Sequence, residues 1–127
     1  MEIRTHIVTN EALQTELAFV LEFFNSNSKA NTCAMLGIGC NIPGDEMYQE
    51  IQMRTDQLSI FVGDKIAKDV YHLGNDDLIM YDRSVDIEFT FCHEHDIHFE
   101  SNDHTLTALI ESRWLQMGYS YYEVNKQ

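Results

Sequence analysis

The sequence lacks any apolar run approaching the roughly 20 residues that a membrane-spanning helix needs. Its N-terminus, MEIRTHIVTNEAL, also lacks the basic segment, apolar segment and small-residue cleavage site of a secretory signal peptide. Cysteine is scarce: Cys33, Cys40 and Cys92 form an odd set at wide spacings, which matches neither a disulfide framework nor a CxxC zinc knuckle. We therefore expect a cytoplasmic protein with reduced, mostly structural thiols.

Basic residues are few as well, because 8 Lys and Arg stand against 21 Asp and Glu, and the formal net charge is −13 at pH 7. This balance makes binding to nucleic acid phosphates or to an anionic membrane unfavourable. A basic protein partner would be attracted. Net charge also promotes solubility whatever the function, so charge alone leaves both interpretations open.

Glycines do not form a phosphate-binding loop in this chain. The segment GIGCNIPGDE, which contains Gly37 and Gly39, has neither the GxGxxG spacing at the start of a helix nor a terminal GK[ST]. Close packing of another element against these glycines explains them better.

Size and patterning indicate one α+β domain. The 127 residues fit a single domain, residues 1–127, and 44% of them are apolar, which is enough for a core. Alternating and helical periodicities predict about six to eight strands, which form a mostly antiparallel twisted sheet packed against two main helices.

Local signals place these elements along the chain. A helix is expected from the candidate N-cap Asn10 to Phe24, and another from a cap at Asn102 or Asp103 to Gly118. A shorter helix is expected at residues 65–73. Strands are expected at residues 2–8, 33–41, 78–81, 85–91 and 119–124, and two more within 48–62, the second of them over 58–62.

The stretch FCHEHDIHFE, residues 91–100, is the densest group of metal-ligating and catalytic residue types. Across residues 85–100 the odd positions are largely apolar and the even positions largely acidic. A single strand of this length would be too long for the domain, so the segment predicts a β-hairpin. A three-residue loop at Glu94–Asp96, with Asp96 in the left-handed conformation, keeps Phe91 and Phe99 on the same face.

This loop pairs Cys92 with His98 and His93 with Ile97. It sends His93 to the apolar side, places Cys92 and His98 on the acidic side, and leaves His95 at the tip. Four metal ligands then do not assemble. We therefore expect no metal site and no cofactor.

Two other functions stay open. A metal-binding enzyme or regulator would use the Cys92–His98 cluster with a nearby carboxylate and a further ligand such as His72 or His104. A homodimeric adaptor would pair through the exposed edge of the strand YSYYEV. Carboxylates around Cys92 would raise the thiol pKa and disfavour the nucleophilic thiolate, so we expect no catalytic residue and no enzyme activity.

The acidic face of the hairpin is the predicted partner-binding surface. Charge complementarity would steer a basic protein toward it, and a tyrosine such as Tyr122 would anchor that protein, whereas Trp114 is expected in the core. The predicted binding residues are Asp76, Asp77, Asp86, Glu88, Glu94, Asp96, Glu100, Asp103 and Tyr122.

The whole chain resembles the small acidic immunity proteins of bacterial polymorphic-toxin and contact-dependent growth inhibition systems. The likeness lies in its size, its charge and the run IHFESNDHTLTALIESRWLQMGYSYYEV, residues 97–124. It implies a cytoplasmic protein that blocks a cognate toxin, often a basic nuclease, by covering its active site or an adjacent surface. The sequence thus predicts a toxin-neutralising immunity protein, either a monomer or a homodimer.

Overall fold

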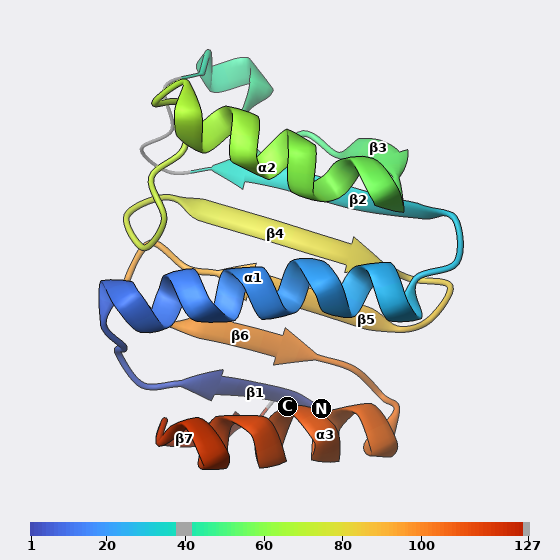
Figure 1. Ribbon diagram of the computed structural model, residues 1–127, viewed down its shortest axis with the longest axis vertical. Helices are drawn as coiled ribbons and strands as arrows, with labels where there is room; N and C mark the ends of the chain where they lie inside the picture. The colour runs from blue at the N-terminus through green and yellow to red at the C-terminus, as the bar shows by residue number, and fades with distance from the viewer. Residues whose placement is uncertain (38–41, 126–127) are drawn as a thin grey trace.

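The structure, a computed structural model, describes residues 1–37 and 42–125 and contains a seven-stranded sheet with three α-helices (Figure 1). The strand order is β3-β2-β4-β5-β6-β1-β7, and all neighbouring strands are antiparallel. The predicted α+β class is confirmed. The strands are β1 (Glu2–Thr5), β2 (Asn31–Gly37), β3 (Ile51–Arg54), β4 (Asp77–Asp82), β5 (Ile87–Phe91), β6 (Ile97–Glu100) and β7 (Tyr121–Val124). The helices are α1 (Asn10–Asn27), α2 (Leu58–Ala67) and α3 (His104–Met117), with short 3-10 turns at Gly44–Glu46 and Thr55–Gln57.

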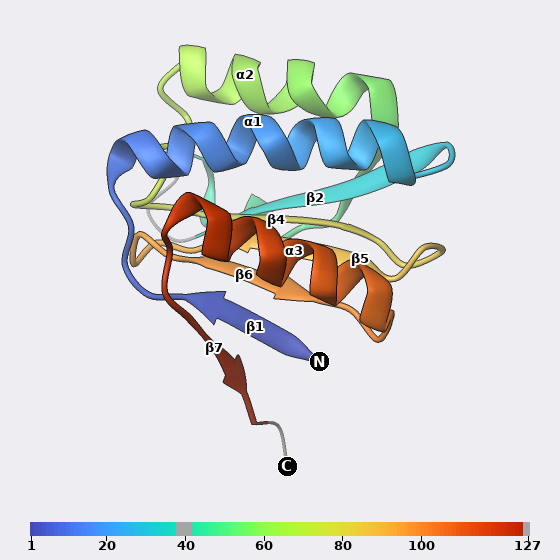
Figure 2. The same cartoon turned by 60° about the horizontal axis from the view of Figure 1, so that its bottom comes forward.

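All three helices lie on one face of the sheet (Figure 1, Figure 2). On that face, Ile3, Phe99, Phe89, Met80 and Ala34 follow one another across five neighbouring strands, and each is at most 1% exposed. Burial of each isoleucine, phenylalanine or methionine side chain in this row stabilises the fold by about 1.5–3 kcal/mol. The core therefore lies between the sheet and the helix layer.

No helix of the described residues lies on the opposite face of the sheet, and we call it the open face. The next row of paired residues, Arg4, His98, Thr90, Ile79 and Met35, lies there, and all five are partly exposed. Polar and charged side chains can reach solvent from this side, as is common for antiparallel sheets.

The two long helices follow the sequence signals closely. Asp103 caps α3 by accepting from the backbone N–H groups of Thr105 and Leu106, and Gly118 ends the helix with a φ of 85°. The N-cap of α1 is Thr9 rather than the predicted Asn10, because Thr9 Oγ1 accepts from the third residue along the helix.

The segment at residues 58–67 corrects the prediction of a strand followed by a helix at 65–73. It forms α2, in which Leu58 and Val62 are 1% and 2% exposed while Ile60 is 62% exposed. The alternation of these three apolar residues suggested a strand, but Leu58 and Val62 are also four apart, which places them on one face of a helix.

The first predicted strand is shorter than expected, and the second is described only in part. β1 ends at Thr5, and Ile7 beyond it is 78% exposed. β2 runs to Gly37, where Tyr48 packs over the missing side chain, since an added Cβ would lie 2.1 Å from its ring. The rest of the predicted strand, with Gly39 and Cys40, lies outside the described residues.

Candidate functional site

The β5–β6 hairpin has a three-residue loop, His93 to His95. Cys92 N donates to Asp96 O at 2.9 Å, His95 N donates to Cys92 O at 3.3 Å, and His95 has a φ of 62°. The loop is therefore one residue earlier than predicted, and His95 rather than Asp96 takes the left-handed conformation. Cys92 faces Asp96 instead of the predicted His98.

Contacts from outside the hairpin hold this register. Gly74 O accepts from His95 N at 3.2 Å, and His95 O accepts from Val8 N at 2.9 Å. Asp77 Oδ1 accepts from both His93 N and His93 Nδ1 at 2.8 Å. The predicted position of His93 on the apolar side is thus wrong, because its ring turns toward the Asp77 carboxylate.

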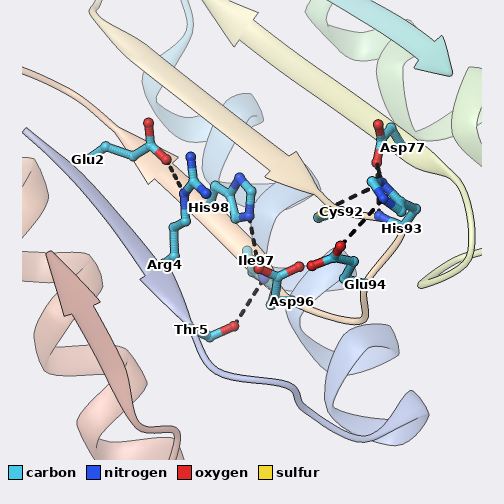
Figure 3. Close-up of polar contacts among 10 residues, drawn as sticks. All are labelled: Glu2, Arg4, Thr5, Asp77, Cys92, His93, Glu94, Asp96, Ile97 and His98. Atoms are coloured by element: carbon cyan, nitrogen blue, oxygen red, sulfur yellow. Dashed lines mark hydrogen bonds and ion pairs between the residues drawn. The ribbon is translucent and has the colours of Figure 1, made fainter. Parts of the chain in front are cut away.

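Five side chains with metal-ligating atoms gather around the start of this loop (Figure 3), and we call them the Cys92 cluster. Asp77, Cys92 and His93 place one ligand atom each within 4.8 Å of one another, and Cys92, Asp96 and His98 do the same. Cys92 Sγ lies 3.7 Å from His93 Nδ1. The prediction that the turn separates His93 from Cys92 is therefore wrong, whereas Cys92 and His98 lie on one side of the hairpin, as predicted.

The environment of Cys92 keeps its thiol protonated at neutral pH. Burial, together with the nearby charges of Asp96 and Asp77, raises the pKa of the Cys92 thiol to about 11, although a backbone hydrogen bond at Glu94 acts in the opposite direction. A protonated thiol is a poor nucleophile. This group is suited to donate a hydrogen bond or, once deprotonated, to bind a cation.

Asp96 and His98 form a half-buried pair, with Asp96 Oδ2 and His98 Nε2 2.9 Å apart. Burial raises the pKa of the Asp96 carboxyl, but the His98 hydrogen bond and charge, aided by the Cys92 thiol, outweigh burial and lower the pKa below its ordinary value. The second carboxylate oxygen, Oδ1, is shielded from solvent and has no hydrogen-bond partner among the described residues.

Three glutamates lie at directly paired positions on the open face, and we call them the Glu row. Glu2 of β1 pairs with Glu100 of β6, which pairs with Glu88 of β5. Like charges at opposing positions normally destabilise a sheet. Arg4 offsets part of the repulsion, since its Nε donates to Glu2 Oε2, and this contact raises the pKa of the Arg4 guanidinium.

A hollow of about 350 Å³ lies beside the Glu row. Its lining includes the carboxylates of Glu88, Glu100 and Asp86, together with Tyr81 and Arg83. Tyr81 is 3% exposed and lies beneath the Arg83 guanidinium, 4.5 Å from the ring centre. The hollow therefore joins three carboxylates to an aromatic base, a combination that suits a cationic side chain.

The remaining predicted binding residues are spread over the molecule. Asp76 and Asp77 are 3% and 8% exposed, and they accept hydrogen bonds from His72 and His93 respectively. Tyr48 also donates to Asp77, at 2.7 Å. Both carboxylates serve the interior of the fold and offer little surface to a partner.

Four others lie nearer to solvent. Asp86 accepts from Asn102 N at 2.7 Å across the neighbouring turns, and Asp103 caps α3. Glu94 lies at the hairpin tip with a 73% exposed side chain, and Tyr122 is 42% exposed on the edge strand β7. Trp114 is 1% exposed, as predicted for a core residue.

Sequence reasoning missed Glu2 as a member of the Glu row, in which it is the buried end at 7% exposed. The alternation in β1 placed it on the polar face, but no local signal indicated which strand would lie beside it. Comparison of the chain with protein-family models, curated proteins and solved structures finds no match. None of the described helices combines the length and apolar character needed to cross a membrane.

Proposed function

We propose that the protein binds a basic protein through the open face of its sheet, and that it acts as an immunity protein that neutralises a toxin domain such as a nuclease. The Glu row with its adjacent hollow carries this proposal. It concentrates carboxylates at a position where a sheet alone would avoid them, on a face that none of the described helices covers (Figure 2).

Charge complementarity explains how such a surface would work. The net charge of −13 raises the rate of encounter with a basic partner and disfavours nucleic acid. The hollow beside Tyr81 would then receive an arginine or lysine side chain from the partner, displacing Arg83 from its position over the ring. A buried cationic anchor of this kind is a common source of binding energy in protein interfaces.

The active site of a toxin that acts on nucleic acid is itself basic, because the toxin must neutralise the phosphates of its substrate. An acidic surface that covers such a site competes directly with the substrate. This mode of inhibition requires no catalytic residue in the inhibitor, and it fits the protonated state of Cys92.

Charge reversal tests the proposal. The protein and its Glu88→Lys, Glu100→Lys and Glu22→Lys variants would be used to capture partners from a lysate of the native cell, with identification by mass spectrometry. Glu22 is exposed on α1, on the helix side of the sheet, and provides a matched control. We expect one basic protein, bound one-to-one by the wild type and by Glu22→Lys and weakened at least tenfold by either open-face variant.

A functional assay completes the test. Expression of the captured partner alone should arrest growth, and co-expression of the wild type should restore it, whereas Glu88→Lys should not. Equal binding by all three variants, or a captured partner without toxicity, would rule out neutralisation through the open face.

A further inference from the structure

The Cys92 cluster combines a thiol, two imidazoles and two carboxylates (Figure 3). It lies at the opposite end of β5 and β6 from Glu88 and Glu100 of the Glu row. Thiolate, imidazole and carboxylate are the three side-chain ligand types that Zn²⁺ prefers. Mg²⁺ and Ca²⁺ prefer oxygen ligands alone. The composition of the cluster therefore favours a cation of the zinc class.

Three ligand atoms of the cluster lie near enough to one another to share one metal ion. Bonds of about 2.0–2.3 Å from zinc to nitrogen, oxygen and sulfur imply distances of about 3.3–3.6 Å between ligand atoms. His98 Nε2 and Asp96 Oδ2 are 2.9 Å apart, and Cys92 Sγ lies within 4.8 Å of a ligand atom of each. Small side-chain rotations would bring these three atoms into coordination.

The unpartnered oxygen of Asp96 points to a ligand at this position. Asp96 Oδ1 is shielded from solvent and accepts no hydrogen bond from the described residues. Two other atoms of Asp96 are bound, since its backbone oxygen accepts from Cys92 N and its Oδ2 pairs with His98 Nε2. Buried carboxylate oxygens are ordinarily paired. By contrast, both oxygens of the neighbouring Asp77 accept hydrogen bonds, from His93 and Tyr48.

We propose that Cys92 Sγ, the Asp96 carboxylate and His98 Nε2 bind one divalent cation of the zinc class, with a water molecule in the fourth position. His93 donates its Nδ1 proton to Asp77, and this nitrogen lies 3.7 Å from the sulfur, so His93 belongs to the surroundings of the site and is not one of the proposed ligands. Binding replaces the thiol proton, which passes to solvent. The inference is independent of the proposed partner binding.

Cobalt(II) is the probe for the test, because a cobalt–thiolate bond gives a charge-transfer absorption band that zinc abolishes by displacement. The experiment would use the full chain without a histidine tag, carrying Cys33→Ser and Cys40→Ser so that Cys92 is the sole thiol. We expect a band that saturates at one equivalent of cobalt and disappears when one equivalent of zinc is added. The absence of a saturable band in this protein would overturn the proposal.

Single substitutions in that background identify the ligands. Cys92→Ser should remove the band, and Asp96→Asn and His98→Ala should each weaken cobalt binding at least tenfold. His72→Ala is the matched control, because His72 also pairs with an aspartate, Asp76, but belongs to no group of metal-ligating side chains among the described residues.

Circular dichroism would establish that each variant is folded before titration. Asp96→Asn preserves the shape of the side chain, so it provides a folded test if His98→Ala does not fold. Unchanged cobalt affinity in Asp96→Asn, or a loss in His72→Ala equal to that in His98→Ala, would show binding outside the proposed site and overturn the assignment.

Discussion

Arg113 joins α3 to α1 through a partly buried ion pair with Glu16, and its replacement by methionine should destabilise the fold strongly. Arg113 Nε and an NH₂ group donate to the two carboxylate oxygens of Glu16 at 2.9 and 2.7 Å. Tyr119 OH donates to the same carboxylate at 3.2 Å, and the guanidinium lies 3.8 Å from the centre of the Phe19 ring. The Glu16 side chain is only 1% exposed.

The size of the effect follows from what remains after the substitution. Methionine keeps the apolar stem but leaves the Glu16 carboxylate buried without a cation, a change that typically costs about 3–5 kcal/mol. Arg113 itself is 24% exposed, so water can approach the carboxylate, and we expect a loss near 3 kcal/mol. Replacing both residues by methionine should restore stability to within about 1 kcal/mol of the wild type, because no buried charge then remains.

Urea unfolding measures both effects. The single tryptophan, Trp114, is 1% exposed and reports on the core by fluorescence, with circular dichroism as a second probe. Arg54→Met is the control, since Arg54 and its partner Asp56 have side chains 69% and 66% exposed, and the expected loss is about 0–1 kcal/mol. A loss below about 1 kcal/mol for Arg113→Met, or a double variant as unstable as the single one, would refute the reasoning.

Burial raises the pKa of the Asp82 carboxyl, but hydrogen bonds from two serines outweigh it and hold the pKa below its ordinary value. The stability that Asp82 contributes is therefore present above about pH 4 and is lost as the pH falls through the folded-state pKa. Asp82→Asn should flatten the acid limb of a stability curve measured by urea unfolding; an unchanged limb would contradict this. Asp103→Ala should destabilise by about 1 kcal/mol in thermal unfolding, because it removes the cap of α3. Gly118→Ala should also cost about 1 kcal/mol, since the φ at this position is 85°. His95→Gly should raise the melting temperature, because glycine adopts a φ of 62° without strain; a lower value would show that the His95 ring outweighs the backbone term.

Helices α1 and α3 could be predicted because their information is local. Each has a polar cap, an apolar stripe at helical spacing and, in α3, a glycine at its end. Residues 58–62 carry ambiguous information, since their apolar positions fit both a strand and a helix. The helix is selected by the contact of Leu58 and Val62 with the core. A local sequence pattern does not contain that contact.

The alternation of side chains in the β5–β6 hairpin predicts an odd loop length but not the position of the loop. Keeping Phe91 and Phe99 on one face requires an odd loop, and the structure has one. A three-residue loop that begins one residue earlier also keeps both phenylalanines on one face, so this requirement does not choose between the two registers. Hydrogen bonds between the loop and Gly74, Asp77 and Val8 fix the actual register, and these residues are distant in sequence.

Both candidate sites depend on strand order, which brings together residues that are far apart in sequence. Glu2 joins the Glu row only because β1 lies between β6 and β7, and Asp77 joins the Cys92 cluster only because β4 lies beside β5. Glu88 and Cys92 are four residues apart along one extended segment, about 13 Å. At that separation, surface charges are largely screened at physiological salt. Glu88→Lys should therefore leave cobalt binding intact, and Cys92→Ser should leave capture of the basic partner intact. If either substitution abolished both properties, the two sites would have to be parts of one.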